Sequence, residues 1–103
     1  MIDKDNIIAL ATPAGLGAIS IIRISGSKSI EITDSLFKSK DGLSLVKKDS
    51  HTITLGEIVD SKRVIDEVLI SLFISPRSYT GENVVEISCH GSSYVQKEII
   101  KLF

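Results

Sequence analysis

The sequence predicts an α+β domain, with a mixed β-sheet and helices packed mainly on one side of it. Two glycine-bearing loops each lead into a segment whose side chains alternate between two faces, residues 18–25 and 84–90. Two other segments, 27–37 and 92–103, place apolar residues at helical spacing behind a serine that can cap a helix. The 103 residues suffice for one small domain, or part of one, with a single modest core.

The first half of the chain is expected to hold two strands and one helix. Residues 6–11 form a short apolar run before a Thr-Pro-Ala-Gly break and are predicted to be a strand, as are residues 18–25. Ser27 is the expected N-cap of the helix that follows. The apolar face of that helix comprises Ile30, Thr33, Leu36 and Phe37. The polar residues 38–50 are predicted to be a loop.

A hairpin is expected next. Residues 51–60 alternate, with Ile53 and Leu55 predicted to face the core. Residues 61–63 resemble a turn, and residues 64–74 form the returning strand.

The segment that ends at His90 carries the most information. Pro76 favours an end to the preceding strand, and the seven residues 84–90 alternate. Val85, Ile87 and Cys89 are predicted to face the core, while Val84, Glu86, Ser88 and His90 share the other face. Ser92 or Ser93 then caps a helix whose apolar face comprises Val95, Ile99, Leu102 and Phe103. Because the chain ends on this apolar face, we expect the domain to continue beyond Phe103.

Composition excludes several classes of protein. The formal net charge of −1 gives no basic field of the kind that binds nucleic acid. One cysteine cannot form an internal disulfide, which fits the cytoplasm. No apolar run is long enough to span a bilayer, and the acidic, polar N-terminus is unlike a signal peptide.

The spacing of the residues excludes several common functional motifs. The glycines at 15 and 17 lack the third glycine and the following helix of a dinucleotide loop, and no phosphate-binding loop motif occurs in the chain. We therefore expect this chain neither to bind nor to hydrolyse GTP. Cys89 and His90 are neighbours on a strand and face opposite sides, so they do not form a nucleophile and its base. With His51 they cannot complete a zinc site, and no catalytic residue or metal site is predicted.

Arg23 and Glu86 are the serious candidates for a binding site. Arg23 lies in the middle of a β-branched run, where an arginine is costly to bury unless something anionic meets it, and Glu86 shares a strand face with His90. The residues alone slightly favour a structural ion pair, or charges that protect a sheet edge. Asp66 and Glu67 also alternate between faces and are interpreted as a solvated edge.

The segments around these two residues together resemble the N-terminal domain of the tRNA-modifying GTPase family TrmE/MnmE. The matching positions are Ala11, Thr12, Pro13, Gly15, Gly17, Ile19, Ile21, Arg23, Ser25 and Gly26, followed by Ser78 to Glu82, Glu86, Cys89, His90 and Gly91. The sequence departs from the family pattern at Ala14, Leu16, Asn83 and Ser92. Leu16 removes a cationic contribution that is common in the first loop.

The resemblance implies a fold similar to tetrahydrofolate-binding one-carbon domains, and a site for 5-formyl-tetrahydrofolate or a related reduced folate. Glu86 then suits the pterin edge, where one carboxylate accepts two adjacent N–H groups. Arg23 suits a carbonyl oxygen or a folate carboxylate. Ser78, Tyr79 and His90 complete the predicted cofactor-binding residues. Tyr79 either stacks on a ring or packs at the base of its loop.

The resemblance also implies a wider setting. Family proteins form homodimers through this domain, and their other domains bind GTP, magnesium and potassium. With a flavin-dependent partner they install an aminomethyl-type group on the wobble uridine of tRNA. Two alternatives remain open: a fragment of a folate-dependent one-carbon transferase, or an oligomerisation module whose folate site has decayed.

Overall fold

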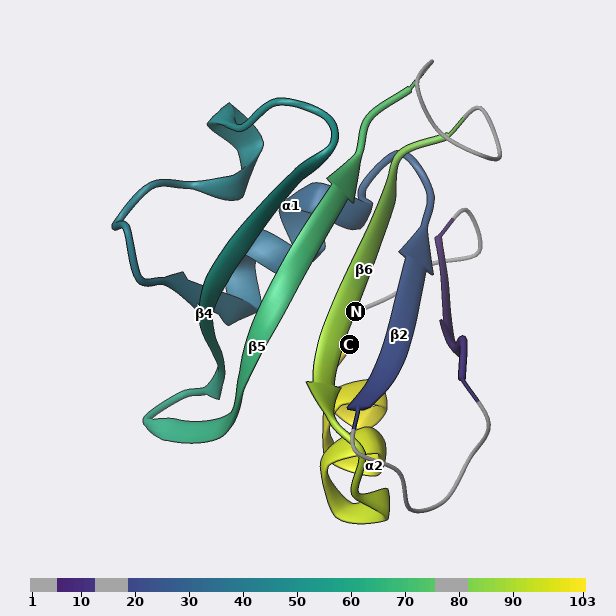
Figure 1. Cartoon of the computed structure of the whole chain (residues 1–103), viewed down its shortest axis with the longest axis vertical. Helices are drawn as coiled ribbons and strands as arrows, with labels where there is room; N and C mark the ends of the chain where they lie inside the picture. Colours follow the sequence, from purple (N-terminus) through teal and green to yellow (C-terminus); the bar gives the residue numbers. More distant parts are fainter. Residues whose placement is uncertain (1–5, 13–18, 76–81) are drawn as a thin grey trace.

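The computed structural model describes residues 6–12, 19–75 and 82–103. Within these residues, six strands form one sheet in the order β1-β2-β6-β5-β4-β3, and two α-helices pack behind it (Figure 1). The elements are β1 (Ile7–Leu10), β2 (Ile19–Ser25), α1 (Ser29–Leu36), β3 (Phe37–Ser39), the 3₁₀ helix η1 (Leu45–Lys47), β4 (Thr52–Asp60), β5 (Arg63–Phe73), β6 (Val84–His90) and α2 (Ser93–Leu102). No helix in these ranges is long and apolar enough to cross a membrane.

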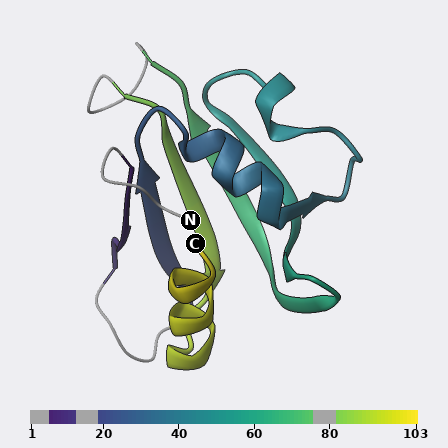
Figure 2. The same ribbon diagram turned by 180° about the vertical axis from the view of Figure 1, so that it is seen from behind.

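The α+β class and the one-sided helices are confirmed. Seen from behind, α1 and α2 both lie over the same face of the sheet (Figure 2). The prediction of a mixed sheet is wrong, because every strand pairing among the described residues is antiparallel. The chain leaves β2 through α1 and enters the sheet again at its far edge, as β3, so this helical crossover creates no parallel neighbour.

The core lies between the sheet and the two helices. The core side predicted for β6 is confirmed, because Val85, Ile87 and Cys89 are buried; Val84, predicted to lie on the other face, is buried as well. Ile22 and Ile24 of β2 are fully buried beside them. The other large contributors are Ile70 and Leu72 of β5, Ile30 of α1, and Ile99 and Phe103 at the end of α2. Burying an aliphatic side chain of this size contributes about 1.5–3 kcal/mol, so this cluster dominates the stability of the domain.

The orientation predicted for β4 is wrong. Ile53 and Leu55 are 69% and 44% exposed, whereas Thr54 between them is buried. The cause is Gly56, where an added Cβ would lie 2.4 Å from the Phe37 ring and 2.4 Å from the Lys38 carbonyl oxygen. Phe37 occupies the space over Gly56, so Gly56 must face the core. Alternation then turns Ile53 and Leu55 outward.

The helix starts are only partly as predicted. Ser92 caps α2, and its hydroxyl accepts a hydrogen bond from the Val95 N–H at 3.0 Å. For α1 the prediction is wrong: Lys28 is the N-cap position, and its own N–H donates to the side chain of Asn6 at 2.9 Å. Phe37 belongs to β3 and not to the helix.

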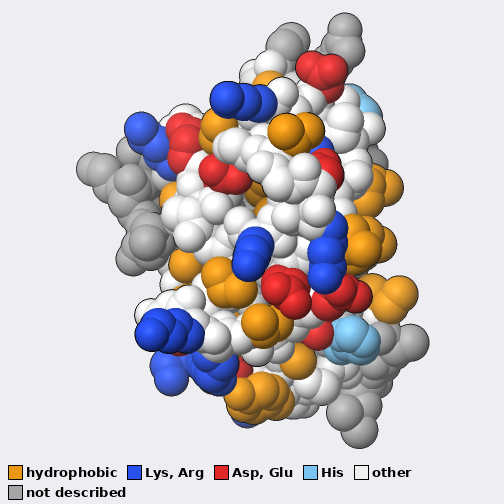
Figure 3. Space-filling model, turned by 90° about the vertical axis from the view of Figure 1, so that its left-hand side faces the viewer, with side chains coloured by type: hydrophobic (Ala, Val, Ile, Leu, Met, Phe, Trp, Pro, Cys, Tyr) orange, Lys and Arg blue, Asp and Glu red, His pale blue; other side chains and the backbone are white. Residues whose placement is uncertain are grey.

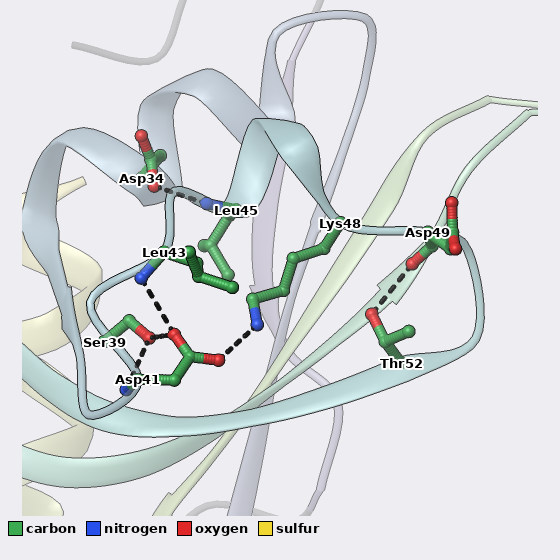
Figure 4. A network of polar contacts seen from close by, with 8 residues as sticks. All are labelled: Asp34, Ser39, Asp41, Leu43, Leu45, Lys48, Asp49 and Thr52. Carbon is green, nitrogen blue, oxygen red and sulfur yellow. Dashed lines mark hydrogen bonds and ion pairs between the residues drawn. The ribbon is translucent and has the colours of Figure 1, made fainter.

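The segment 38–50, predicted to be a loop, contains β3 and η1 and is held by two aspartates (Figure 4). Asp34 accepts hydrogen bonds from the Leu45 N–H at 2.8 Å and from the Ser44 hydroxyl at 2.9 Å. Asp41 accepts hydrogen bonds from Lys48, from Ser39 and from the Leu43 N–H, and these bonds hold the pKa of its carboxyl well below the usual range. The network fixes η1 so that Leu45 enters the core.

The two faces of β4 give a matched test of this fold. Ile58→Ala should lower the free energy of unfolding by about 2–5 kcal/mol, because Ile58 is fully buried. Ile53→Ala, on the same strand, should cost roughly 1 kcal/mol or less, because its side chain is on the open face. Urea denaturation of both variants measures the difference. Equal losses would show that Ile53 faces the core as the alternation alone suggests.

Candidate functional site on the open face of the sheet

The face of the sheet opposite the helices has no covering layer among the described residues (Figures 1 and 2). Its exposed large apolar side chains are Ile7, Ile19, Ile53, Leu55 and Leu69. In a view from the β4 side, hydrophobic side chains gather along the right-hand edge, which is this open face (Figure 3). Lysines and acidic residues intermingle on the side turned to the viewer, so no large basic patch lies there.

Arg23 and Glu86 meet at the centre of the open face. They are directly opposite each other on β2 and β6, and the Arg23 Nη2 and Nε atoms lie 2.6 Å and 3.0 Å from the same Glu86 oxygen, Oε2. The Glu86 side chain is only 18% exposed, whereas that of Arg23 is 46% exposed. Within the described part of the chain, Glu86 makes no other hydrogen bond, and its Oε1 atom has no hydrogen-bond partner there.

A second polar pair lies next to the first. The Ser25 hydroxyl donates a hydrogen bond to Glu82 Oε2 at 3.2 Å. Both residues belong to the motifs that carry the family resemblance, but sequence reasoning assigned no role to either. The only available signal was that Ser25 shares a strand face with Arg23, two residues away.

His90 does not join Arg23 and Glu86. It lies four residues beyond Glu86 on the same face of β6, a separation of roughly 14 Å along a strand. Its Nδ1 atom is 2.7 Å from Asp66 Oδ1, and its backbone N–H donates to Asp66 Oδ2 at 2.8 Å. The interpretation of Asp66 as a solvated edge residue is wrong, because its side chain is 11% exposed and holds His90 at two points.

A shallow cleft of about 210 Å³ lies between these features, beside His90. Its apolar walls are Ile19, Leu55 and Leu69, and its polar lining includes Ser88 and Glu67. The predicted site residues Ser78 and Tyr79 lie outside the described residues, so their assignment stays a prediction. No cluster of three or more metal-binding side chains occurs in the described part of the chain.

Cys89 points away from this face. Its side chain is buried, and the thiol donates to the Ser20 carbonyl oxygen at 3.6 Å. Burial, with a smaller contribution from the nearby Asp66 carboxylate, raises the pKa of the Cys89 thiol to about 11. The thiol is therefore protonated near neutral pH and acts as a small core residue.

Comparison with known proteins supports the resemblance. The family model of the GTP-binding protein TrmE N-terminus matches residues 6–103. The chain is 55% identical over 102 residues to the tRNA modification GTPase MnmE of Flavobacterium johnsoniae, covering 99% of this chain and 22% of that protein. The corresponding protein of Christiangramia forsetii is 57% identical over 99 residues, covering 96% of this chain and 21% of the relative.

A more distant relative gives the same result. The tRNA modification GTPase MnmE of Bacillus subtilis is 44% identical over 100 residues, covering 95% of this chain and 22% of that protein. The chain belongs to the TrmE N-terminus family. It spans about a fifth of the length of these relatives.

The burial of Cys89 predicts its reactivity. A pKa near 11 leaves about a hundredfold less thiolate at pH 8 than an ordinary thiol near 9, so the folded chain should react slowly with a disulfide reagent. The raised pKa also makes the free energy of unfolding depend on pH. This free energy should fall as the pH rises from about 9 towards 11, because the unfolded chain releases the thiol proton first. Reagent labelling and urea denaturation at several pH values measure both effects.

The matched control is Ser88→Cys combined with Cys89→Ala, which moves the thiol to the open face of the same strand. This control should label much faster than the parent chain while folded. Equal labelling rates would contradict the burial of Cys89.

Proposed function

We propose that this chain is a reduced-folate-binding and dimer-forming domain of a tRNA modification GTPase. The observation that carries the proposal is the Glu86 carboxylate, which is mostly buried and held by Arg23 through one oxygen only. A pterin ring presents adjacent N–H donors along one edge, and an anchored carboxylate is a suitable acceptor for them. Arg23 orients the Glu86 carboxylate and forms an ion pair with it before the ligand binds.

The same geometry favours a ligand-binding role for the Arg23–Glu86 pair over a purely structural role. Arg23 is nearly half exposed, and ion pairs of that kind contribute only about 0–1 kcal/mol to stability. The pair therefore adds little net stability to the fold, although Arg23 compensates the charge of the mostly buried Glu86 carboxylate. The described neighbours of Glu86 on the open face include the small residue Ser71, its partner on β5, which leaves room for a planar ring above the carboxylate.

The wider role rests on the relatives, which are tRNA modification GTPases. We infer that the protein containing this domain works in the cytoplasm with a flavin-dependent partner. It helps to install an aminomethyl-type group on the wobble uridine of tRNA, and the folate supplies the one-carbon unit. GTP, magnesium and potassium bind to other parts of that protein, because these 103 residues contain no phosphate-binding loop motif.

A second copy of the chain is the proposed occupant of part of the open face. Ile53 on β4 is 69% exposed there, and β4 is separated from the Glu86 strand β6 by β5. Side chains of this size on an uncovered sheet favour association, and a two-fold contact would cover both copies at once. The net charge of −1 opposes such a contact only weakly.

The folate proposal is tested by calorimetric titration with 5-formyl-tetrahydrofolate. Glu86→Ala and Glu86→Gln should each weaken binding about tenfold or more, because a charge-assisted hydrogen bond to a mostly buried carboxylate is lost. Arg23→Ala should also weaken binding. Glu57→Ala removes a carboxylate from the open side of β4 and serves as the matched control, with unchanged affinity expected. If the Glu86 variants bind as tightly as the parent, the site is assigned wrongly.

If this chain alone transferred the formyl group of the bound folate, the result would instead favour the hypothesis that it is a fragment of a folate-dependent one-carbon transferase. A chain that dimerises but binds no reduced folate would favour the decayed oligomerisation module.

The dimer proposal is tested by sedimentation. The parent chain should form a dimer at micromolar concentration, and Ile53→Asp should shift it towards monomer by placing a charge in the contact. Val46→Asp changes another exposed β-branched apolar side chain, on η1, which packs beside α1, and should leave the dimer intact. A parent chain that sediments as a monomer over a wide concentration range would contradict the proposal.

A further inference from the structure

We propose that Asp41 and Gly42 form a modification site, at which Asp41 converts to isoaspartate through a cyclic imide when the surrounding loop opens. This loop, here called the η1 loop, comprises residues 39–48 and runs from the end of β3 through η1. Its hydrogen bonds suppress the conversion while the chain is folded. The modification therefore accumulates on chains whose η1 loop has opened, and it marks these chains chemically.

The sequence supplies one dipeptide that is suited to this reaction. Of the 7 glycines in the chain, Gly42 alone follows an aspartate or an asparagine. Because glycine has no Cβ, nothing on Gly42 hinders the approach of its nitrogen to the carboxyl carbon of the preceding side chain. Asp41, Gly42 and Leu43 are all exposed, so water reaches the site.

The reaction requires only the chain and water. The Gly42 nitrogen bonds to the Cγ atom of a protonated Asp41 carboxyl group and loses its own proton, while the Cγ–OH bond breaks and one water molecule leaves. A second water molecule then opens the five-membered imide ring. When this water attacks the main-chain carbonyl carbon, the chain continues through Cγ, and the new carboxylate is attached directly to Cα. The product has the mass of the parent chain and one extra methylene in its backbone.

The folded η1 loop opposes the first step at the Asp41 carboxylate (Figure 4). Lys48 Nζ donates a hydrogen bond to Oδ2, while the Ser39 hydroxyl and the Leu43 N–H donate to Oδ1, the latter at 2.9 Å. The bond from Lys48, followed by those from Ser39 and Leu43, holds the pKa of the Asp41 carboxyl well below its usual range. The carboxyl is therefore ionised, whereas imide formation requires the protonated group.

The attacking nitrogen is also held in the folded loop. The Gly42 N–H donates a hydrogen bond to the Ser39 carbonyl oxygen at 3.3 Å. Imide formation removes this proton, so the bond to Ser39 must break before the ring can close. Because both reacting groups are bound within the same loop, the reaction depends on a local opening of residues 39–48.

Isoaspartate at position 41 would hinder the loop from closing again. The extra methylene moves Gly42 and Leu43 relative to Ser39, and the carboxylate on Cα is too short to keep the contacts of the original side chain. The η1 helix would then lose one of the two aspartate anchors that place the fully buried Leu45 in the core, and only Asp34 would remain. The modified chain should therefore unfold at a lower urea concentration than the parent chain.

The test measures isoaspartate formation in the parent chain, in buffer and in urea at the same pH and temperature. Isoaspartate is counted by methylation of its carboxylate with an isoaspartyl methyltransferase, and chromatography of the peptide that contains Asp41 locates it. Formation should be at least about tenfold slower in buffer, because only the fraction of chains with an open loop reacts.

Two variants release the Asp41 carboxylate. Lys48→Met keeps much of the largely buried stem of Lys48 but removes its charge, and Ser39→Ala removes the hydroxyl donor. Each should raise the rate in buffer at least about threefold, the effect of one exposed hydrogen bond, and leave the rate in urea unchanged. Lys47→Met is the matched control, because the exposed Lys47 makes no hydrogen bond to Asp41 in the described part of the chain, and it should change neither rate.

Gly42→Ala tests the chemistry itself. A Cβ added at Gly42 meets no atom within 4 Å, so the alanine has room, although the positive φ of 75° costs some stability. In urea, where the fold no longer matters, this variant should form isoaspartate more slowly than the parent chain, because the methyl group hinders the attacking nitrogen.

Several results would overturn the proposal. These are equal rates in buffer and in urea for the parent chain, equal rates in buffer for Lys48→Met and Lys47→Met, or no isoaspartate at position 41 in urea. If urea denaturation shows that Lys48→Met is already unfolded in buffer, Ser39→Ala decides by the same comparison with Lys47→Met, because this variant keeps the carbonyl acceptor of residue 39.

Discussion

The pairing of β6 between β2 and β5 is the constraint on which the rest of the structure depends. Its register places Ile87 between Ile22 and Ile70 on the core side, and the same register places Glu86 opposite Arg23 on the open side. A slip of one residue would turn the apolar set outward, at a cost that the whole core opposes. The geometry of the candidate site is therefore maintained by the packing of the opposite face, and not by the strength of the ion pair itself.

A polar contact between β5 and α2 has a structural role that can be compared with the Arg23–Glu86 pair. Arg63, at the start of β5, donates to Glu98 at 2.8 Å and to the Tyr94 hydroxyl at 2.9 Å, both on α2. The hydrogen bond from Arg63 lowers the pKa of the Glu98 carboxyl. This contact ties a helix to the sheet. The Arg23–Glu86 pair links two strands that are already joined by backbone pairing, so it adds little to holding these strands together.

Sequence reasoning succeeded for the core side of β6, where the alternation of Val85, Ile87 and Cys89 predicted that these side chains are buried. It failed at β4, because the orientation of Ile53 depends on Phe37 filling the space over Gly56, a contact between segments that no local pattern records. It failed at Asp66 for a similar reason, since the pairing of β5 with β6 brings His90 to that carboxylate.

The two ends of β6 hold their acceptors in different ways, and the difference has a physical basis. Near the centre of the sheet, the carboxylate of Glu86 is mostly buried, and burial of a charge requires an opposite charge close by. At the end of the strand, the exposed His90 ring has two tautomers and many orientations available. A carboxylate that binds both its backbone N–H and its Nδ1 atom reduces these to one. Each of the two side chains thus has one atom bonded to a protein partner, Arg23 in one case and Asp66 in the other. Both side chains lie on one rigid strand, β6.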